Sequence, residues 1–173
     1  VQTCALPIYY QCDVRTLLHQ DWDLMVAHPP CTYLCSSGLH WNKRRPGRQA
    51  LTEQALLFVQ TLMDCPIKRI AIENPTGCIS TRIRKPDQII QPWMFGHPES
   101  KTTCLWLKNL PLLHPTNVLV KSPGSRWDNQ TPSGQNKLGP SSDRWKLRSL
   151  TYPGIRSEEH TSNSSHLVIS YAV

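Results

Sequence analysis

Two short apolar runs organise the hydrophobic pattern of this chain, and each ends in a polar or reactive side chain. Residues 23–28 are apolar from position 24 to 27, and Pro29 and Pro30 follow at once. Residues 67–72 form a second, mostly apolar run that ends at Glu73. Such runs are typical of strands covered on both faces, and proline stops a strand because it cannot donate to the ladder. The pattern therefore predicts two buried strands.

A helix is predicted between these strands, over residues 49–63, because apolar side chains recur there at helical spacing. The expected inner face consists of Leu51, Ala55, Phe58, Val59 and Leu62. Strand, helix and strand in alternation indicate an α/β fold with a parallel sheet. We also expect strands at residues 87–93, 102–107 and 117–120, a strand end at 9–12, a short helix at 14–19, an ordered segment at 145–155 and a mobile loop at 121–140.

Composition narrows the class of protein. The 173 residues, 39% hydrophobic and 18% charged, suit one globular domain with a core. No apolar run approaches the roughly 18 residues that a membrane span needs. The seven cysteines show no disulfide-scaffold spacing, so we expect reduced thiols and a cytoplasmic location. A formal charge of +7 favours an anionic partner such as nucleic acid.

Both ends of the chain differ in character from the rest. Residues 2–8, 156–162 and 169–173 resemble the conceptual translation of a common short-read sequencing adapter. Segments of this kind are set apart in fold reasoning, as tags are. We therefore expect residues 1–8 and 156–173 to be foreign, and residues 9–155 to be a domain cut at both ends from a longer protein.

The two strand ends carry the candidate chemistry, because ligands of open α/β sheets bind outside the carboxyl ends of the strands. Pro29 and Pro30 fix the backbone before Cys31, which suits a nucleophile, and Glu73 at the rim of a core suits a general acid. Two other interpretations stay open: a zinc site or a Cys–His hydrolase. The zinc site would use Cys31, Cys35, His28 and His40, whereas Cys35, Cys65, Cys78 and Cys104 are otherwise expected to be buried apolar residues.

A basic run follows the candidate nucleophile. Lys43, Arg44, Arg45 and Arg48 lie in or next to the loop after Cys31. Such a run is often only a solvated face, but in this position it could hold phosphate groups. We keep these four residues as candidate nucleic-acid contacts.

Three motifs, in order, resemble those of DNA cytosine-5 methyltransferases. Pro29-Pro30-Cys31 resembles the catalytic Pro-Pro-Cys motif of that family, and Glu73-Asn74-Pro75 resembles its Glu-Asn-Val motif. Residues 95–101, Phe-Gly-His-Pro-Glu-Ser-Lys, resemble the later segment Phe-Gly-x-Pro-Gln-x-Arg. Residues 23–38, 72–74, 87–107 and 138–155 also resemble compact proteins of this type from bacteriophages and prophages.

The resemblance implies a fold, a reaction and roles for single residues. It implies a partial Rossmann-like sheet of the S-adenosylmethionine-dependent methyltransferases, without its first βα unit. Cys31 would add to C6 of a flipped-out DNA cytosine, Glu73 would donate a proton or hydrogen bond near N3, and C5 would take the methyl group from S-adenosylmethionine. Asp13 and Pro30 would contact that cofactor, and Lys101 would contact the DNA.

Other consequences of the resemblance concern what is missing. The glycine-rich motif that binds S-adenosylmethionine in the family would lie upstream of residue 9, so we expect the chain alone to be inactive. We expect a monomer without a metal, acting in the cytoplasm of a bacterial host. The alternatives are a non-catalytic relative that binds nucleic acid and a methyltransferase that acts on a free pyrimidine nucleotide.

Overall fold

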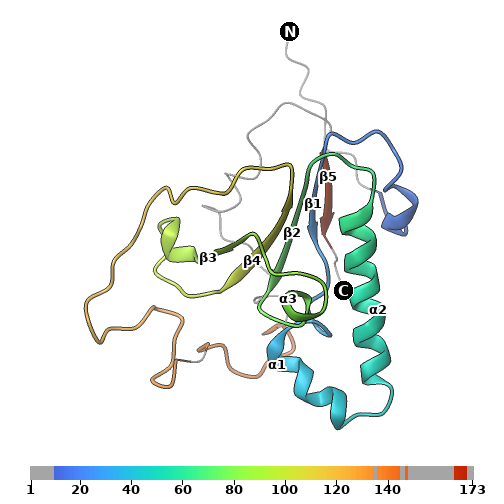
Figure 1. Ribbon diagram of the computed structural model, residues 1–173. Helices are drawn as coiled ribbons and strands as arrows, with labels where there is room; N and C mark the ends of the chain where they lie inside the picture. The colour runs from blue at the N-terminus through green and yellow to red at the C-terminus, as the bar shows by residue number, and fades with distance from the viewer. Residues whose placement is uncertain (1–9, 135, 145–146, 148–165, 171–173) are drawn as a thin grey trace.

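The computed structural model describes residues 10–134, 136–144, 147 and 166–170. Their centre is a mixed five-stranded sheet with the order β3-β4-β2-β1-β5 (Figure 1). Strands β1 and β2 are parallel to each other, and β5 is parallel to β1, whereas β4 runs antiparallel to both β2 and β3. The strands are β1 (Leu24–His28), β2 (Ile70–Pro75), β3 (Gln88–Ile90), β4 (Thr103–Lys108) and β5 (His166–Ser170).

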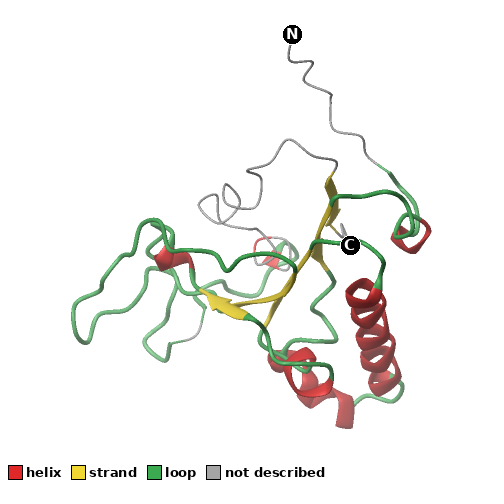
Figure 2. Cartoon of the chain, turned by 45° about the horizontal axis from the view of Figure 1, so that its top comes forward, coloured by secondary structure: helices red, strands yellow, loops and turns green. Residues whose placement is uncertain are grey.

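The long helix α2 (Arg48–Asp64) connects β1 to β2 and packs along one face of the sheet (Figures 1 and 2). Its buried residues are Thr52, Leu56, Val59 and Leu62, which recur every three or four positions. Burying Val59 and Leu62 completely contributes about 1.5–3 kcal/mol each relative to exposure. The predicted helix is confirmed, and so are Val59 and Leu62 on its inner face, with Ala55 and Phe58 partly buried against the core. The prediction for Leu51 is wrong, because Leu51 is 40% exposed and its neighbour Thr52 is buried.

Thr52 can be buried at the start of α2 because both functions of its hydroxyl group are used. The hydroxyl donates to the Tyr33 carbonyl at 3.1 Å and accepts from the Asn42 amide at 2.9 Å. Two hydrogen bonds offset most of the free-energy cost of removing a hydroxyl group from water. A polar residue thus anchors the loop after β1 to the first turn of α2.

The sheet confirms the α/β class, but the expectation of a parallel sheet is wrong for β4. Strand β2 begins at Ile70, three residues later than predicted, and β3 is short because Pro92 starts the 3₁₀ turn η3 (Pro92–Met94). Residues 117–120 form only a bridge from Asn117 to Phe95, and residues 10–12 form no strand. The predicted short helix is the 3₁₀ turn η1 (Val14–Thr16).

Two predictions about the end of the chain have different outcomes. Most of the segment predicted to be ordered at 145–155 lies outside the described residues. Residues 166–170 fall in the tail that we expected to be foreign, and their backbone forms β5 along β1, pairing Leu24 with His166 and His28 with Ser170. The sheet is therefore extended on the β1 side by this segment.

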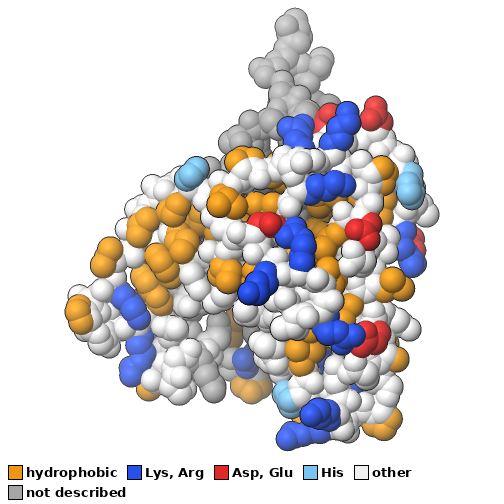
Figure 3. Space-filling model, in the orientation of Figure 1, with side chains coloured by type: hydrophobic (Ala, Val, Ile, Leu, Met, Phe, Trp, Pro, Cys, Tyr) orange, Lys and Arg blue, Asp and Glu red, His pale blue; other side chains and the backbone are white. Residues whose placement is uncertain are grey.

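A second layer covers the other side of β4 and contains the outer loops. Ile90, Phe95 and Leu105 form a small separate core there. Figure 3 shows hydrophobic side chains gathered over this part of the molecule, on the left. No helix among the described residues is both long and apolar enough to cross a membrane.

The segment 121–140 was predicted to be a mobile loop, and the structure gives it specific contacts. Asn129 holds Ser100 by two hydrogen bonds, of 3.0 and 2.8 Å, and the Asp128 amide donates to the Pro98 carbonyl at 2.8 Å. Trp127 stacks on Trp93 with ring centroids 5.8 Å apart. These contacts attach the loop to the segment that leads into β4.

Candidate functional site

The predicted nucleophile follows the carboxyl end of β1, whereas the predicted acid lies within the adjacent parallel strand β2, which continues past it to Pro75. The register pairs Ala27 of β1 with Ile72 of β2, so the next residues, His28 and Glu73, are also neighbours. Side chains alternate along strands, and Ala27 and Ile72 face the core under α2. His28 and Glu73 therefore project together from the opposite face.

A hydrogen bond joins these two side chains. His28 Nδ1 lies 3.1 Å from Glu73 Oε2, and the two side chains are only 22% and 20% exposed. A carboxylate has no hydrogen to donate, so the imidazole Nδ1–H is the donor when Glu73 is ionised. Water is partly excluded from the pair, which strengthens the interaction compared with one on the open surface.

The loops after β1 and β2 are joined by backbone hydrogen bonds, at what we call the loop crossing (residues 34–36 and 76–78). The Ser36 amide donates to the Thr76 carbonyl and the Cys78 amide to the Leu34 carbonyl, both at 2.9 Å. Gly77 makes this approach possible, because a Cβ there would lie 1.9 Å from the Leu34 carbonyl oxygen. The crossing fixes the Cys31 loop relative to the end of β2.

A buried side chain adds a third connection between the strand ends. Asn74 is 1% exposed, and its amide donates to the Pro29 carbonyl at 2.8 Å. Proline has a fixed φ and no amide hydrogen, so its carbonyl is the one backbone group that Pro29 can offer. The bond thus holds the backbone between His28 and Cys31. Asn74 Oδ1 is buried without a hydrogen-bond partner among the described residues.

Cys31 is exposed and sits at the start of a helical turn. Its carbonyl accepts from the Leu34 and Cys35 amides at 3.0 and 2.9 Å, so the turn brings the Cys35 thiol back over Cys31. A hydrogen bond with the Cys35 thiol raises the pKa of Cys31 above the usual thiol range. Although the residue as a whole is exposed, partial desolvation of its thiol adds to this effect, and so does the negative charge of Glu73. These effects favour the neutral thiol form of Cys31.

Asp13, predicted to bind the cofactor, does not join this site. Its turn lies beside the upper part of α2, near the start of β1, whereas the reactive side chains follow the other end of that strand (Figures 1 and 2). Asp13 caps η1, and hydrogen bonds from the Arg15 side chain and backbone lower its pKa to about 2. The Asp13 carboxylate is paired with Arg15 and lies apart from the reactive strand ends, and its contact with the cofactor stays a prediction. Pro30 is half-buried next to Cys31, and its contact with the cofactor stays a prediction.

The basic residues divide into two groups. Lys43, Arg44 and Arg45 are exposed, and among the described residues no carboxylate pairs with them. The Arg45 and Arg44 guanidinium groups lie 4.5 and 5.8 Å from the ring centroid of Trp41. Figure 3 shows Lys and Arg side chains at the lower end of the molecule, where Figure 1 places α1 (Ser36–Leu39) and the start of α2.

Arg48 belongs to the loop's own packing. Its guanidinium lies 4.8 Å from the ring centroid of Tyr33, and Nη2 donates to the Thr32 carbonyl at 2.9 Å. Arg48 therefore supports the backbone just after Cys31, and the exposed cationic loop consists of residues 43–45.

Lys101, the predicted DNA contact, is placed at the same edge as the reactive residues. It precedes β4, whose Thr103 pairs with Pro75 at the end of β2. The Gln91 side chain accepts from the Lys101 amide at 3.0 Å and donates to the Thr102 hydroxyl at 2.8 Å. The structure thus brings the third motif next to the first two.

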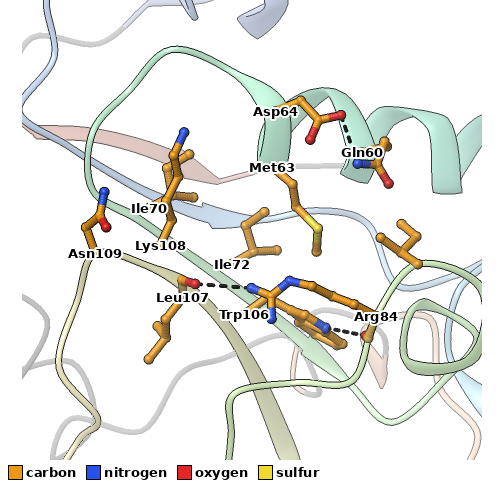
Figure 4. A pocket seen from close by; sticks show the side chains of 11 residues that line it. Gln60, Met63, Asp64, Ile70, Ile72, Arg84, Trp106, Leu107, Lys108 and Asn109 are labelled. Carbon is orange, nitrogen blue, oxygen red and sulfur yellow. Dashed lines mark hydrogen bonds between the residues drawn. The ribbon is translucent and has the colours of Figure 1, made fainter.

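A cavity of about 540 Å³ lies elsewhere, between α2 and the strands β2 and β4 (Figure 4). Its polar side chains already bond within the protein: Lys108 donates to the Cys65 carbonyl, Asn109 to the Lys68 carbonyl and Gln60 to Asp64. A ligand site needs a few polar groups aimed inward. These three side chains are therefore not available to a ligand, and we place the functional site at the strand ends.

Two residues of the site were not predicted for their role. His28 was considered only as a zinc ligand, and Asn74 only as part of a motif. The signal for His28 was available, since it directly precedes Pro29 at a strand end one position after Ala27. Among the described residues no group of three or more His, Cys, Asp or Glu side chains could hold a metal ion, so the zinc alternative is not assembled there.

The fold and the site together define a mixed α/β protein with Cys, His and Glu side chains at the carboxyl ends of two parallel strands. No protein-family model, no curated protein and no solved structure matches the chain.

Proposed function

We propose that this chain carries the cytosine-attacking part of a DNA (cytosine-5) methyltransferase, with Cys31 as nucleophile and Glu73 as proton donor. The observation that carries the proposal is the juxtaposition of these residues across β1 and β2. His28, three residues before Cys31, bonds to Glu73 at 3.1 Å, and the Asn74 amide bonds to the Pro29 carbonyl. The loop crossing holds the two loops in place. The resemblance of residues 29–31, 73–75 and 95–101 to three motifs of that family names the substrate.

The chemistry follows from the two side chains. The Cys31 sulfur forms a bond to C6 of cytosine, and the electron pair of the C5–C6 double bond moves through the ring towards N3. N3 takes a proton from the Glu73 carboxyl, which leaves a carboxylate. C5 is then an enamine carbon that can attack an electrophile. Loss of the C5 hydrogen as a proton, return of the N3 proton to the Glu73 carboxylate and departure of the sulfur as a thiolate restore the ring.

The raised pKa of Cys31 sets a condition on this first step. In the protein without substrate the sulfur carries its proton, so the thiolate must form once the pyrimidine is bound. Protonation of Glu73 removes the negative charge that contributes to the raised pKa of Cys31. Transfer of a proton between the two groups or through water would therefore prepare both for the addition.

S-adenosylmethionine is the methyl donor that the resemblance implies. The described residues do not supply a site for it. Asp13 is paired with Arg15 at the other end of β1. In the cavity of Figure 4, the side chains of Lys108, Asn109 and Gln60 already bond within the protein. The chain alone is therefore expected to transfer no methyl group, and the activity that we propose for it is limited to reversible addition to the pyrimidine ring.

The location and the partner belong to the same proposal. Flipped-out cytosine in DNA is the substrate, the cationic loop and Lys101 would contact phosphate groups, and the protein would act as a monomer in the cytoplasm of a bacterium that carries the phage or prophage. A free pyrimidine nucleotide is the alternative substrate, and phosphate contacts would serve it too.

A Cys–His hydrolase is disfavoured by the position of His28, whose Nδ1 lies 3.1 Å from Glu73 Oε2. In such enzymes a nearby imidazolium lowers the pKa of the cysteine. Here Cys35, burial and Glu73 raise the pKa of Cys31, and His28 is directed at Glu73. The arrangement favours attack on a ring such as cytosine, in which N3 can accept the proton.

The test is hydrogen exchange at C5. Duplex DNA or dCMP labelled with tritium at C5 is incubated with the protein, with and without S-adenosylmethionine, because addition of Cys31 at C6 makes the C5 hydrogen exchangeable with water. We expect tritium release with the unaltered chain and none with Cys31→Ser. Release only from dCMP would move the substrate to nucleotides.

The controls decide between the remaining alternatives. Cys35→Ser leaves the nucleophile in place and should still release tritium. Undiminished release by Cys31→Ser would remove Cys31 from its role. Salt-sensitive DNA binding with no release from either substrate would favour the non-catalytic relative.

A further inference from the structure

We propose that His28 is a positioning residue that acts through Glu73: its Nδ1–H holds Oε2 of the carboxyl group, so that Oε1 faces the pyrimidine. This inference rests on the proposed function. The hydrogen bond of 3.1 Å between Nδ1 and Oε2 carries it.

The backbone around His28 keeps its imidazole in this position. His28 is the last residue of β1, pairs with Ser170 of β5 and is followed by Pro29. The Pro29 carbonyl is held by Asn74, the residue after Glu73. Imidazole and carboxyl group are thus attached to two strands that are connected immediately next to them.

The environment of Glu73 makes a hydrogen-bond donor useful there. After the larger effects of Cys35 and desolvation, the negative charge of Glu73 adds to the raised pKa of Cys31, so this thiol does not neutralise the carboxylate. A donated hydrogen bond stabilises a charged acceptor roughly twice as well as a neutral one. His28 supplies this bond to the carboxylate that remains after N3 has taken the proton.

The geometry also assigns different tasks to the two oxygens of Glu73. A carboxyl group that is free to rotate presents either oxygen to the base, so only a part of its orientations is productive. With Oε2 held by His28, one orientation persists and Oε1 is the oxygen directed at the substrate. Orientation of this kind lowers the entropic part of the barrier without touching the reacting atoms.

The experiment compares tritium release from C5-labelled DNA by the unaltered chain, His28→Leu and His28→Asn. Leucine removes the donor, whereas the asparagine amide places an N–H close to the position of Nδ1. We expect His28→Leu to lower kcat by about 10- to 100-fold, the range for loss of a hydrogen bond to a charged group, with KM changed little. His28→Asn should recover most of that loss, and His114→Leu, at an exposed histidine outside the site, should have no effect.

A double-mutant cycle shows whether His28 acts through Glu73. In the Glu73→Ala background the substitution His28→Leu should cause no further loss, because the oxygen that accepts from His28 is already gone. The same additional loss in both backgrounds would overturn the proposal, and so would unaltered release by His28→Leu.

A second measurement does not need the reaction. NMR of the histidine ring nitrogens should show a proton on His28 Nδ1 in the unaltered chain and loss of its protection in Glu73→Ala. An unprotonated Nδ1 would overturn the inference. If the chain releases no tritium but shows this signal, the proposed function fails and the His28–Glu73 bond stands.

Discussion

The loop crossing and the cationic loop come from the same stretch of chain after β1, and they are held in different ways. At the crossing, backbone groups of residues 34–36 and 76–78 bond directly, without room for one extra carbon at Gly77. The cationic loop, residues 43–45, is exposed, and contacts of Arg44 and Arg45 with the ring of Trp41 organise it. Contacts of this kind contribute only about 0.5–1 kcal/mol each at exposed sites.

This difference matches what each region would have to do. Addition to a ring carbon needs a sulfur and a carboxyl group at fixed positions, because misplacement of reacting groups is costly. Phosphate groups are recognised by charge, which tolerates movement of flexible side chains. The chain therefore uses rigid backbone contacts next to Cys31 and adjustable side-chain contacts a few residues later.

Breaking the crossing should have the largest effect. In Gly77→Ala the new methyl group would meet the Leu34 carbonyl oxygen, and the two loops must separate. We expect a loss of about 3 kcal/mol or more in the free energy of unfolding, measured in urea, because backbone cannot move aside as a side chain can. Gly139→Ala is the control, since nothing lies within 4 Å of its Cβ position. Equal stability of the two variants would contradict the rigid crossing.

Removing the charges of the cationic loop should weaken DNA binding and leave stability unchanged. For Lys43→Ser, Arg44→Ser and Arg45→Ser combined, the slope of log affinity against log salt should fall by about 3, since each phosphate contact contributes about 0.9. Fluorescence anisotropy with a labelled duplex measures this slope. The single change Arg48→Ser should instead lower stability, because Arg48 holds the Thr32 carbonyl. An unchanged slope in the triple variant would remove the loop from the interface.

The smallest expected effect concerns the reactivity of Cys31. The hydrogen bond with Cys35 is the largest cause of its raised pKa, so Cys35→Ala should lower that pKa and increase the thiolate fraction at a given pH. Alkylation of Cys31 by iodoacetamide, followed by peptide mass spectrometry, should be several-fold faster in the variant. In the unaltered chain the rate should keep rising with pH beyond the usual thiol range. Exposed Cys12 provides the reference in the same digest. Equal rates would show that Cys35 does not restrain the sulfur.

The sequence predicted the elements whose pattern was strong and local. The apolar run at residues 24–27 and the spacing in α2 were sufficient for β1 and for the helix. The direction of β4 was beyond such reasoning, because apolar positions alternate in the same way in parallel and antiparallel strands. The burial of Thr52 depends on partners at Tyr33 and Asn42, which spacing alone does not reveal.

The candidate site was predictable to a similar degree. Cys31 and Glu73 were expected to meet because carboxyl ends of parallel strands share an edge, and the structure places them there. Asp13 was assigned by resemblance alone, and its local partner Arg15 takes it out of the site. The role of Gly77 could not be predicted. A residue without a Cβ is required at this position only because two loops that are distant in sequence approach each other there.

The hydrogen bond from Asn74 to Pro29 joins residues 45 positions apart, and so does the one between His28 and Glu73. Closing a loop of this length costs about 3 kcal/mol of chain entropy, which local helix formation does not offset. During folding, α2 can therefore form early, whereas the strand ends meet only when β1 and β2 have paired. The proximity of Cys31 to Glu73 is then a late event, and a probe on Cys31 would report completion of the sheet.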